Sequence, residues 1–189
     1  MILGRSVVAE GKPVAEVVVE GELSPFEDEA LYRILRDSFQ VDHPTYKQLS
    51  DEELSTRVNV VFHHPYSATL FSQVLQENWR ELKDLLKQVR YRRGRAGAAF
   101  TLTFNGPVLQ FVFKSGILDE SALGSALDQI GHLTGVIGQM LRPDTMDQAL
   151  VRIESTYDKR SDRWNDFRGS TSSAECYVFD ESVFRWVRS

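Results

Sequence analysis

Four arginines near the middle of the chain are the residues with the most obvious chemical potential. Arg90, Arg92, Arg93 and Arg95 lie close together, with Tyr91 among them and no acidic residue between them. Guanidinium groups beside an aromatic ring suit phosphate contacts and stacking. The segment is therefore a predicted site for an anionic ligand or a nucleic acid. The alternative is a solvated helix end whose cations pair with acidic residues near the N-terminus.

The histidines offer a second kind of chemistry, metal binding. His63 and His64 are adjacent at the end of a predicted strand. Adjacent strand residues point to opposite faces, so one metal ion cannot easily bind both, and their spacing matches no zinc-protease helix motif. A small metal-dependent hydrolase using His63 or His64 with Asp42 or His43 is a second alternative function. The favoured prediction has no bound metal and no cofactor.

Sequence signatures of nucleophilic enzymes are lacking. There is no Gly-x-Ser-x-Gly motif, and the segment 94–97 lacks the lysine and the preceding strand of a P-loop. Cys176 precedes a run of strand-forming residues, and no nearby cation would stabilise its thiolate. We expect it to be a buried, inert thiol. These observations favour a non-enzymatic protein.

Four of the twelve glycines fall in one predicted helix over residues 120–141. Gly124, Gly131, Gly135 and Gly138 lie within about 60° of one another at 100° per residue, and we call them the glycine stripe. Each glycine costs a helix interior about 1 kcal/mol relative to alanine, so something must offset that cost. Three interpretations are open: close packing on the chain's own elements, a partner or dimer surface, and a ligand lying over the stripe.

A second indication of partner binding lies between residues 158 and 174, a long polar stretch that we predict to be a loop. It carries Trp164 and Phe167 among several arginines, a composition typical of interface anchors. The alternative is a hairpin excursion whose tryptophan folds back onto the sheet. The predicted partner-binding residues are Gly124, Gly131, Gly135, Gly138, Trp164 and Phe167.

Periodicity and caps predict the elements that must position these residues. Ser24 and Glu27 form a Ser-x-x-Glu capping box with Pro25 at the first helical position, and Ser50 with Glu53 forms a second box. The predicted elements are a hairpin (6–10 and 14–20), a helix beginning at Ser24, a strand (57–62), a helix (68–91), a hairpin turning at Asn105-Gly106 as type I′, a helix (120–141), a strand (149–157) and a last strand or hairpin (175–188).

The element order is ββ-α-β-α-ββ-α-β-β. Strands adjacent in sequence are joined by short turns, so we expect an α+β fold with a largely antiparallel sheet and about three helices. We expect one domain over residues 1–189, with residues 1–65 as an alternative N-terminal subdomain. The element order over 68–160 is similar in outline to secretion-chaperone-like and roadblock-like modules. That likeness is one of element order only and implies no function.

Composition places the chain among ordinary globular proteins of the cytoplasm. It has 189 residues, 27 acidic and 22 basic side chains and one cysteine. Residues 1–30 hold seven acidic and two basic residues, a balance of −5 that equals the whole net charge. A chain without a basic face is not typical of general nucleic-acid binders, and no apolar run is long enough for a membrane partner to be expected.

These observations together predict a non-enzymatic intracellular interaction or adaptor protein that is homodimeric. Its partner is expected to be another protein or a second copy of the chain. Nucleic acid, or another anionic ligand bound by the arginine segment, is the alternative partner.

Overall fold

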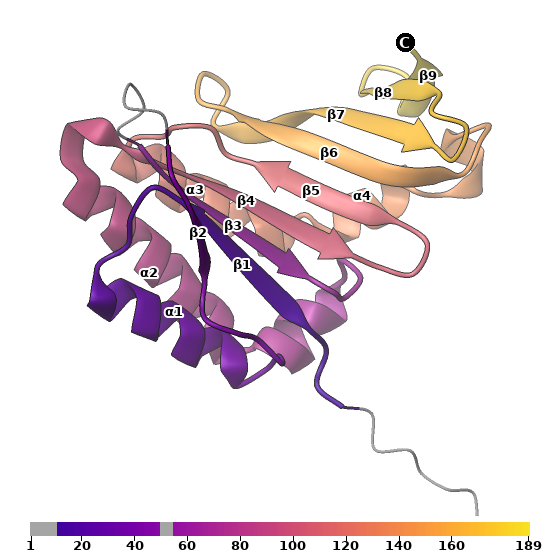
Figure 1. Cartoon of the computed structure of the whole chain (residues 1–189). Coiled ribbons are helices and arrows are strands. Elements are labelled where there is room, and N and C mark those ends of the chain that lie inside the picture. The colour runs from indigo at the N-terminus through magenta and orange to yellow at the C-terminus, as the bar shows by residue number, and fades with distance from the viewer. Residues whose placement is uncertain (1–10, 50–54) are drawn as a thin grey trace, which may run out of the picture.

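The computed structural model describes residues 11–49 and 55–189, and it places one sheet over a layer of helices (Figure 1). Within these residues the sheet has nine strands in the order β2-β1-β3-β4-β5-β6-β7-β8-β9. The strands are β1 (Ala15–Glu20), β2 (Thr45–Lys47), β3 (Thr56–Phe62), β4 (Ala98–Asn105), β5 (Gln110–Lys114), β6 (Leu150–Asp158), β7 (Arg163–Thr171), β8 (Cys176–Asp180) and β9 (Arg185–Arg188).

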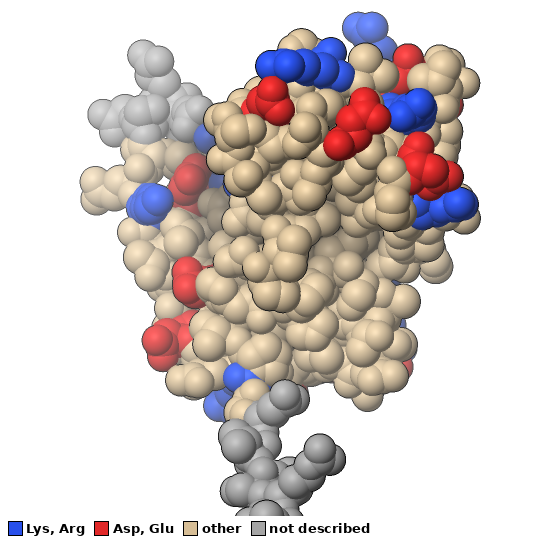
Figure 2. Space-filling view, turned by 90° about the vertical axis from the view of Figure 1, so that its right-hand side faces the viewer, with Lys and Arg blue, Asp and Glu red and all other residues tan. Residues whose placement is uncertain are grey.

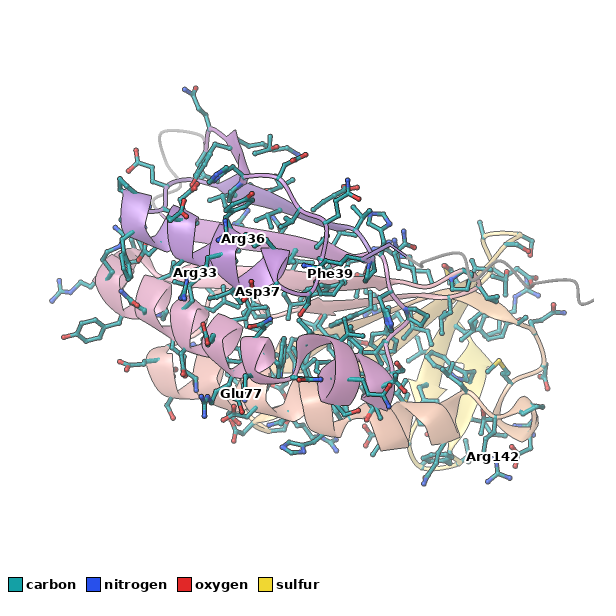
Figure 3. All side chains as sticks on the ribbon, turned by 90° about the horizontal axis from the view of Figure 1, so that it is seen from below. Arg33, Arg36, Asp37, Phe39, Glu77 and Arg142 are labelled. Atoms are coloured by element: carbon teal, nitrogen blue, oxygen red, sulfur yellow. The ribbon has the colours of Figure 1, made fainter. Side chains whose placement is uncertain are left out.

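The helical layer consists of four α-helices and three short turns of other helix types in the described part of the chain. The α-helices are α1 (Pro25–Arg36), α2 (Glu77–Arg93), α3 (Glu120–His132) and α4 (Thr134–Met140). The short turns are the π-helix η1 (Leu70–Leu75) and the 3-10 helices η2 (Gly94–Ala96) and η3 (Pro143–Thr145). Seen from below the sheet, α1, α2 and α3 lie side by side (Figure 3).

The sheet is mixed, which corrects the prediction of a largely antiparallel one. β1 pairs with β2, β3 with β4, and β5 with β6 in parallel, and the other described neighbours pair antiparallel. The reason lies in the helices. α2 connects β3 to β4, and α3 with α4 connects β5 to β6, so each connection returns the chain to the end where the preceding strand began. The fold is α+β, as expected.

The helices cover one face of the sheet, and the core lies between the two layers. In β3 the buried side chains Val58, Val60 and Phe62 alternate with less buried ones, and they face the helices together with Phe104 of β4 and Phe111 of β5. The rings of Phe62 and Phe104 stack at 5.3 Å between centroids. No described helix covers the other face of the sheet (Figure 1).

Local signals at the helix ends are confirmed, but the lengths of two helices are not. The capping box is present: the Ser24 hydroxyl accepts from the Glu27 N–H at 3.2 Å, and the Ser24 N–H donates to Glu27 Oε2 at 2.8 Å. The predicted helix 68–91 is interrupted at Gln76, whose φ is 46°. The predicted helix 120–141 is divided at Leu133 into α3 and α4.

Three further predictions need correction. Residues 163–171 of the expected loop form strand β7. The β4–β5 connection uses four residues, with the Gly106 N–H donating to the Leu109 carbonyl at 3.1 Å, and is not a two-residue type I′ turn. Cys176 is exposed rather than buried, because it lies on the uncovered face of β8.

Two predicted features, the strand 6–10 and the second capping box at Ser50, lie outside the described residues. Among the residues that the structure does describe, no helix is long and apolar enough to cross a membrane. The sheet, its helical layer and the core between them are therefore what positions the candidate sites.

Candidate functional site

The arginine segment lies at the C-terminal end of α2, and its central contact is an ion pair. Arg92 donates to both carboxylate oxygens of Glu27, from Nε at 2.7 Å and from Nη2 at 2.6 Å. The Glu27 side chain is 1% exposed, whereas that of Arg92 is 39% exposed. Burial alone would raise the pKa of Glu27, but hydrogen bonds from Arg92 and Ser24 outweigh it and hold this pKa below its usual 4.5. Arg92 therefore links the C-terminal end of α2 to the first turn of α1 through this ion pair.

Two of the remaining arginines bind the backbone. Arg90 donates to the carbonyls of Leu118 and Gly94, and Arg93 donates to the carbonyl of Glu22. Arg95 is exposed and has no partner among the described residues. Most of the cluster thus stabilises the end of a helix against its neighbours. This arrangement supports the alternative of a structural helix end over an anion site, which stays a prediction.

Three of the four histidines, His43, His63 and His64, each contact a different partner. His63 Nε2 lies 2.9 Å from Glu16 Oε1, and His43 Nδ1 lies 3.1 Å from Asp28 Oδ1. His64 Nδ1 lies 2.8 Å from a neighbouring backbone carbonyl oxygen. Over residues 11–49 and 55–189, no group of three or more His, Cys, Asp or Glu side chains is arranged so that it could hold a metal ion. The geometry gives no support to the hydrolase alternative.

Trp164 and Phe167, the two aromatic residues predicted as interface anchors, are buried under the sheet. The Trp164 indole N–H donates to the Ala126 carbonyl of α3 at 2.9 Å, and its ring meets that of Phe113 at 4.9 Å. The Phe167 ring lies 6.4 Å from that of Phe111. Their burial corresponds to the alternative in which the hairpin folds back on the sheet. As anchors for a partner they would first have to leave the core.

The glycine stripe is different, because the chain's own packing does not require it. A methyl group built on Gly124 would meet only Lys87 Cε at 3.5 Å. One on Gly131 would lie 3.5 Å from Trp79 Nε1, which is ordinary van der Waals contact. A methyl group built on Gly135 or Gly138 would have no described atom within 4 Å of it, apart from its own helix backbone and chain neighbours. Alanine would fit all four positions, so close packing on neighbouring helices does not explain the glycines.

A tryptophan of α2 faces the stripe. Trp79 is 8% exposed, but its indole nitrogen is open to solvent: over the described residues, the buried side-chain nitrogen or oxygen atom without a hydrogen-bond partner is Arg93 Nε. The other two tryptophans are also buried, but Trp164 and Trp186 donate to carbonyls of Ala126 and Met140, each at 2.9 Å. Buried polar groups in proteins are nearly always paired. The N–H of Trp79 is no exception to this, because it is open to solvent beside Gly131.

A groove runs beside the stripe between α2 and α3. It has a volume of about 790 Å³ and is lined by Lys87, Gly124, Asp128 and His132, among others. Lys83 Nζ crosses from α2 to Asp128 Oδ1 at 2.7 Å, and this ion pair, outweighing the effect of burial, lowers the pKa of Asp128. The surface beside Gly124 therefore carries an ion pair, Lys83 with Asp128, rather than an excess of positive or negative charge.

Gly131, Gly135 and Gly138 lie at an end of the molecule where the helix carries no Lys, Arg, Asp or Glu. Three segments that lack Lys, Arg, Asp and Glu, residues 58–76, 96–113 and 129–141, converge there. Figure 2 looks at this end and shows charged side chains along the upper rim and at the sides of a broad area without any. We call the surface formed by α4, the β4–β5 connection and residues 65–66 the uncharged end.

The uncharged end contains a small apolar pocket of about 250 Å³. Tyr66 lies in its wall with the hydroxyl donating to the Ile130 carbonyl. Ile137 of α4 lines the pocket, at about 160° around the helix from Gly135 and about 100° from Gly138. Val108 and Val136 protrude nearby, 75% and 47% exposed. α4 thus carries the stripe on one side and closes an apolar pocket on the other.

Sequence reasoning found the stripe but missed Trp79 and the uncharged end. Trp79 continues the spacing of Leu75 and Leu82, so its burial was visible in the periodicity, whereas its position beside Gly131 was not. The three charge-free segments are also plain in the sequence. Their meeting at one end depends on the sheet order, which no local pattern reveals.

Known proteins give no further guide to these residues. No family model, curated protein or solved structure compared with the chain matches it.

Proposed function

We propose that this chain is a non-enzymatic interaction protein that acts as a homodimer, with the glycine stripe and α4 as its contact surface. The observation that carries the proposal is that none of the four stripe glycines is required by contacts among the described residues. A helix that keeps glycine where alanine would fit loses about 1 kcal/mol at each position. Close approach of an outside helix offsets such a loss in small-residue helix crossings.

A second copy of the chain fits this surface better than a charged partner does. A symmetric dimer places the same surface of both copies face to face, so a charge near the axis would meet its own image. Residues 129–141 contain no Asp, Glu, Lys or Arg, so an axis at α4 brings no like charges together. The exposed Val136 adds apolar surface at the same place.

Substituting leucine into the stripe tests this proposal. Gly135→Leu and Gly138→Leu enter open space in the single chain, and leucine is nearly as good a helix former as alanine. We expect the wild-type chain to sediment as a dimer whose proportion falls on dilution, and either variant to sediment as a monomer with an unchanged far-ultraviolet spectrum. The larger side chain would hold two helices apart.

The matched control adds the same side chain elsewhere. Glu29 is an exposed residue of α1, which lies on the far side of α2 from the stripe (Figure 3). Glu29→Leu should therefore leave the dimer intact. A wild-type chain that stays monomeric at all concentrations would refute the homodimer. A dimer that survives both glycine substitutions would show that the contact surface lies elsewhere.

A further inference from the structure

We propose that residues 1–10, which precede the described part of the chain, return over the uncharged end and place Ile2 and Leu3 in its apolar pocket. The chain itself then covers the pocket. This inference goes beyond the proposed homodimer and does not depend on it, because Ile137 lines the pocket at about 160° around α4 from Gly135. The pocket and the stripe can therefore be occupied at the same time.

The first step is the chemistry of the pocket. None of the nine described residues that line it carries a charge, and the hydroxyl of Tyr66 in its wall already donates to the Ile130 carbonyl. The rings of Tyr66 and Phe111 stack at 5.1 Å between centroids and form an aromatic side of the pocket. An apolar cavity of about 150 Å³ accommodates a benzene molecule. The volume of about 250 Å³ therefore has room for two aliphatic side chains.

The second step is where the described chain begins. β1 starts at the end of the sheet at which the antiparallel strand β3 finishes (Figure 1). The Val14 carbonyl accepts from the His63 N–H at 2.9 Å, and Pro65, two residues after His63, lines the pocket. Gly11 precedes Val14 by three residues, so it lies within about 22 Å of the pocket rim. The described chain therefore begins beside the uncharged end.

The third step is the length of chain available. Leu3 and Ile2 precede Gly11 by eight and nine residues. An extended chain spans about 3.3 Å per residue, so their reach of about 26–30 Å exceeds the largest distance between Gly11 and the pocket rim. Val8 and Val7 precede Gly11 by three and four residues, a reach of about 10–13 Å. Ile2 and Leu3 are therefore the aliphatic pair with enough chain to enter the pocket.

The fourth step is that β1 has no free edge for these residues among the described strands. One edge of β1 pairs with β3 along its whole length. On the other edge, the Ala15 N–H donates to the Gln40 carbonyl at 3.0 Å, and β2 pairs with residues 18–20. A hairpin of residues 6–10 with β1 would have to displace one of these partners. The apolar residues before Gly11 need another surface, and the pocket supplies one at the same end of the sheet.

The charge of the segment matches that of the surface. Residues 1–4 carry no charged side chain, like the three segments that form the uncharged end. Arg5, the first charged residue, follows Leu3 by two positions and stays outside the pocket. Docking of Ile2 and Leu3 therefore takes no charged side chain out of water, which would be costly. A partner that presented an apolar side chain to the pocket would first have to displace this pair.

Nuclear Overhauser effects in the unaltered full chain test the proposal directly. In ¹³C-methyl-labelled protein we expect such effects between the methyl groups of Ile2 or Leu3 and the ring protons of Tyr66 and Phe111. Samples that mix labelled with unlabelled chains identify the source. Effects within one chain persist on dilution and are absent between chains. Effects found only between chains would overturn the proposal, because the occupant would then be a second copy.

A neutral apolar dye, N-phenyl-1-naphthylamine, measures whether the pocket is free. If the segment is docked in about nine chains of ten, only about a tenth of the pockets are open, so Ile2→Asp/Leu3→Asp should lower the apparent dissociation constant of the dye about 10-fold. Val108 lines the pocket and is 75% exposed. Adding Val108→Asp to the double variant should abolish this gain, because it places a charge beside the dye.

Each substitution has a matched control. Ser6→Asp/Ala9→Asp adds the same two charges to the segment and keeps its aliphatic pair, so dye binding should stay at the wild-type level. Val183 lies in the β8–β9 connection and is 59% exposed. Val183→Asp in place of Val108→Asp should preserve the gain in dye affinity.

The outcomes decide the proposal whether or not the chain dimerises. It is refuted if Ile2 and Leu3 show no effect on the pocket rings and the dye binds the wild-type chain and Ile2→Asp/Leu3→Asp equally well: the pocket is then open to other apolar occupants. A variant that fails to fold cannot decide the matter either way, because the contacts are measured in the unaltered chain.

Discussion

The end of α2 and the glycine stripe of α3 and α4 lie on the same layer of helices, and they use their residues in opposite ways. At the end of α2, Arg92 binds a buried carboxylate, and Arg90 and Arg93 bind backbone carbonyls of neighbouring segments. Along the stripe, four helical positions lack side chains that the described part of the fold has room for.

The difference shows which kind of feature points outside the chain. A cluster of charges is conspicuous in a sequence, but here the fold itself satisfies most of it. A group of small residues attracts less attention, yet no contact among the described residues offsets its cost in helix stability. Glycines that the described packing does not require, rather than conspicuous charges, therefore locate the candidate contact surface.

The strongest test of this comparison breaks the ion pair at the end of α2. Arg92→Ala leaves the carboxylate of Glu27 buried without its cation, and removing one partner of a buried pair is costly. Because Arg92 is 39% exposed, water can replace part of the contact. We expect the free energy of unfolding to fall by about 2–3 kcal/mol in urea denaturation.

Arg95→Ala is the matched control for that experiment, because Arg95 is exposed in the same cluster and has no described partner. Its effect should stay within about 0.5 kcal/mol. Equal effects of the two substitutions would mean that the cluster acts as a whole and that the contrast drawn between the two regions is wrong.

Acid should weaken the same contact. The pKa of Glu27 is lower in the folded chain than its usual 4.5, because hydrogen bonds from Arg92 and Ser24 outweigh burial. A lowered pKa contributes stability above the unfolded value, and this contribution is lost as the pH falls through the folded value. The stability advantage of the wild-type chain over Glu27→Gln should therefore be constant near neutral pH and shrink below about pH 4.5. Urea midpoints measured between pH 7 and pH 3 check this.

The sequence predicted the helices well because their signals are local. The box of Ser24 and Glu27 and the cap at Asp119 are both present, since a side chain and a backbone N–H three residues away suffice to form each. The interruptions at Gln76 and Leu133 were missed, because no proline marks them.

Strand pairing was predicted less well, because it depends on distant segments. The parallel pairs follow from helical crossovers, whereas the prediction considered only the turns between strands. Strand β7 was missed because its buried residues Trp164 and Phe167 are three apart. Register shifts in the pairing of β6 with β7, and the positive φ of Asp166, break the alternation that identifies a strand.

The candidate site was predictable in its outline only. The angular spacing of the four glycines follows from the geometry of one continuous helix, whereas the structure divides them between α3 and α4 at Leu133. Deciding between internal packing and an outside partner required the distances around each glycine.

A small change in the stability of the single chain separates internal packing of the stripe from a contact outside the chain. Gly138→Ala places a methyl group where no described atom lies within 4 Å, so the dilute, monomeric chain should become more stable by up to about 1 kcal/mol. Gly169→Ala is the control: its methyl group would lie 2.7 Å from Leu150 Cδ1, and it should destabilise the chain. Thermal unfolding at low protein concentration gives both values. If Gly138→Ala were also destabilising, the glycine would serve the chain's own fold, and the reason to place a second copy on α4 would disappear.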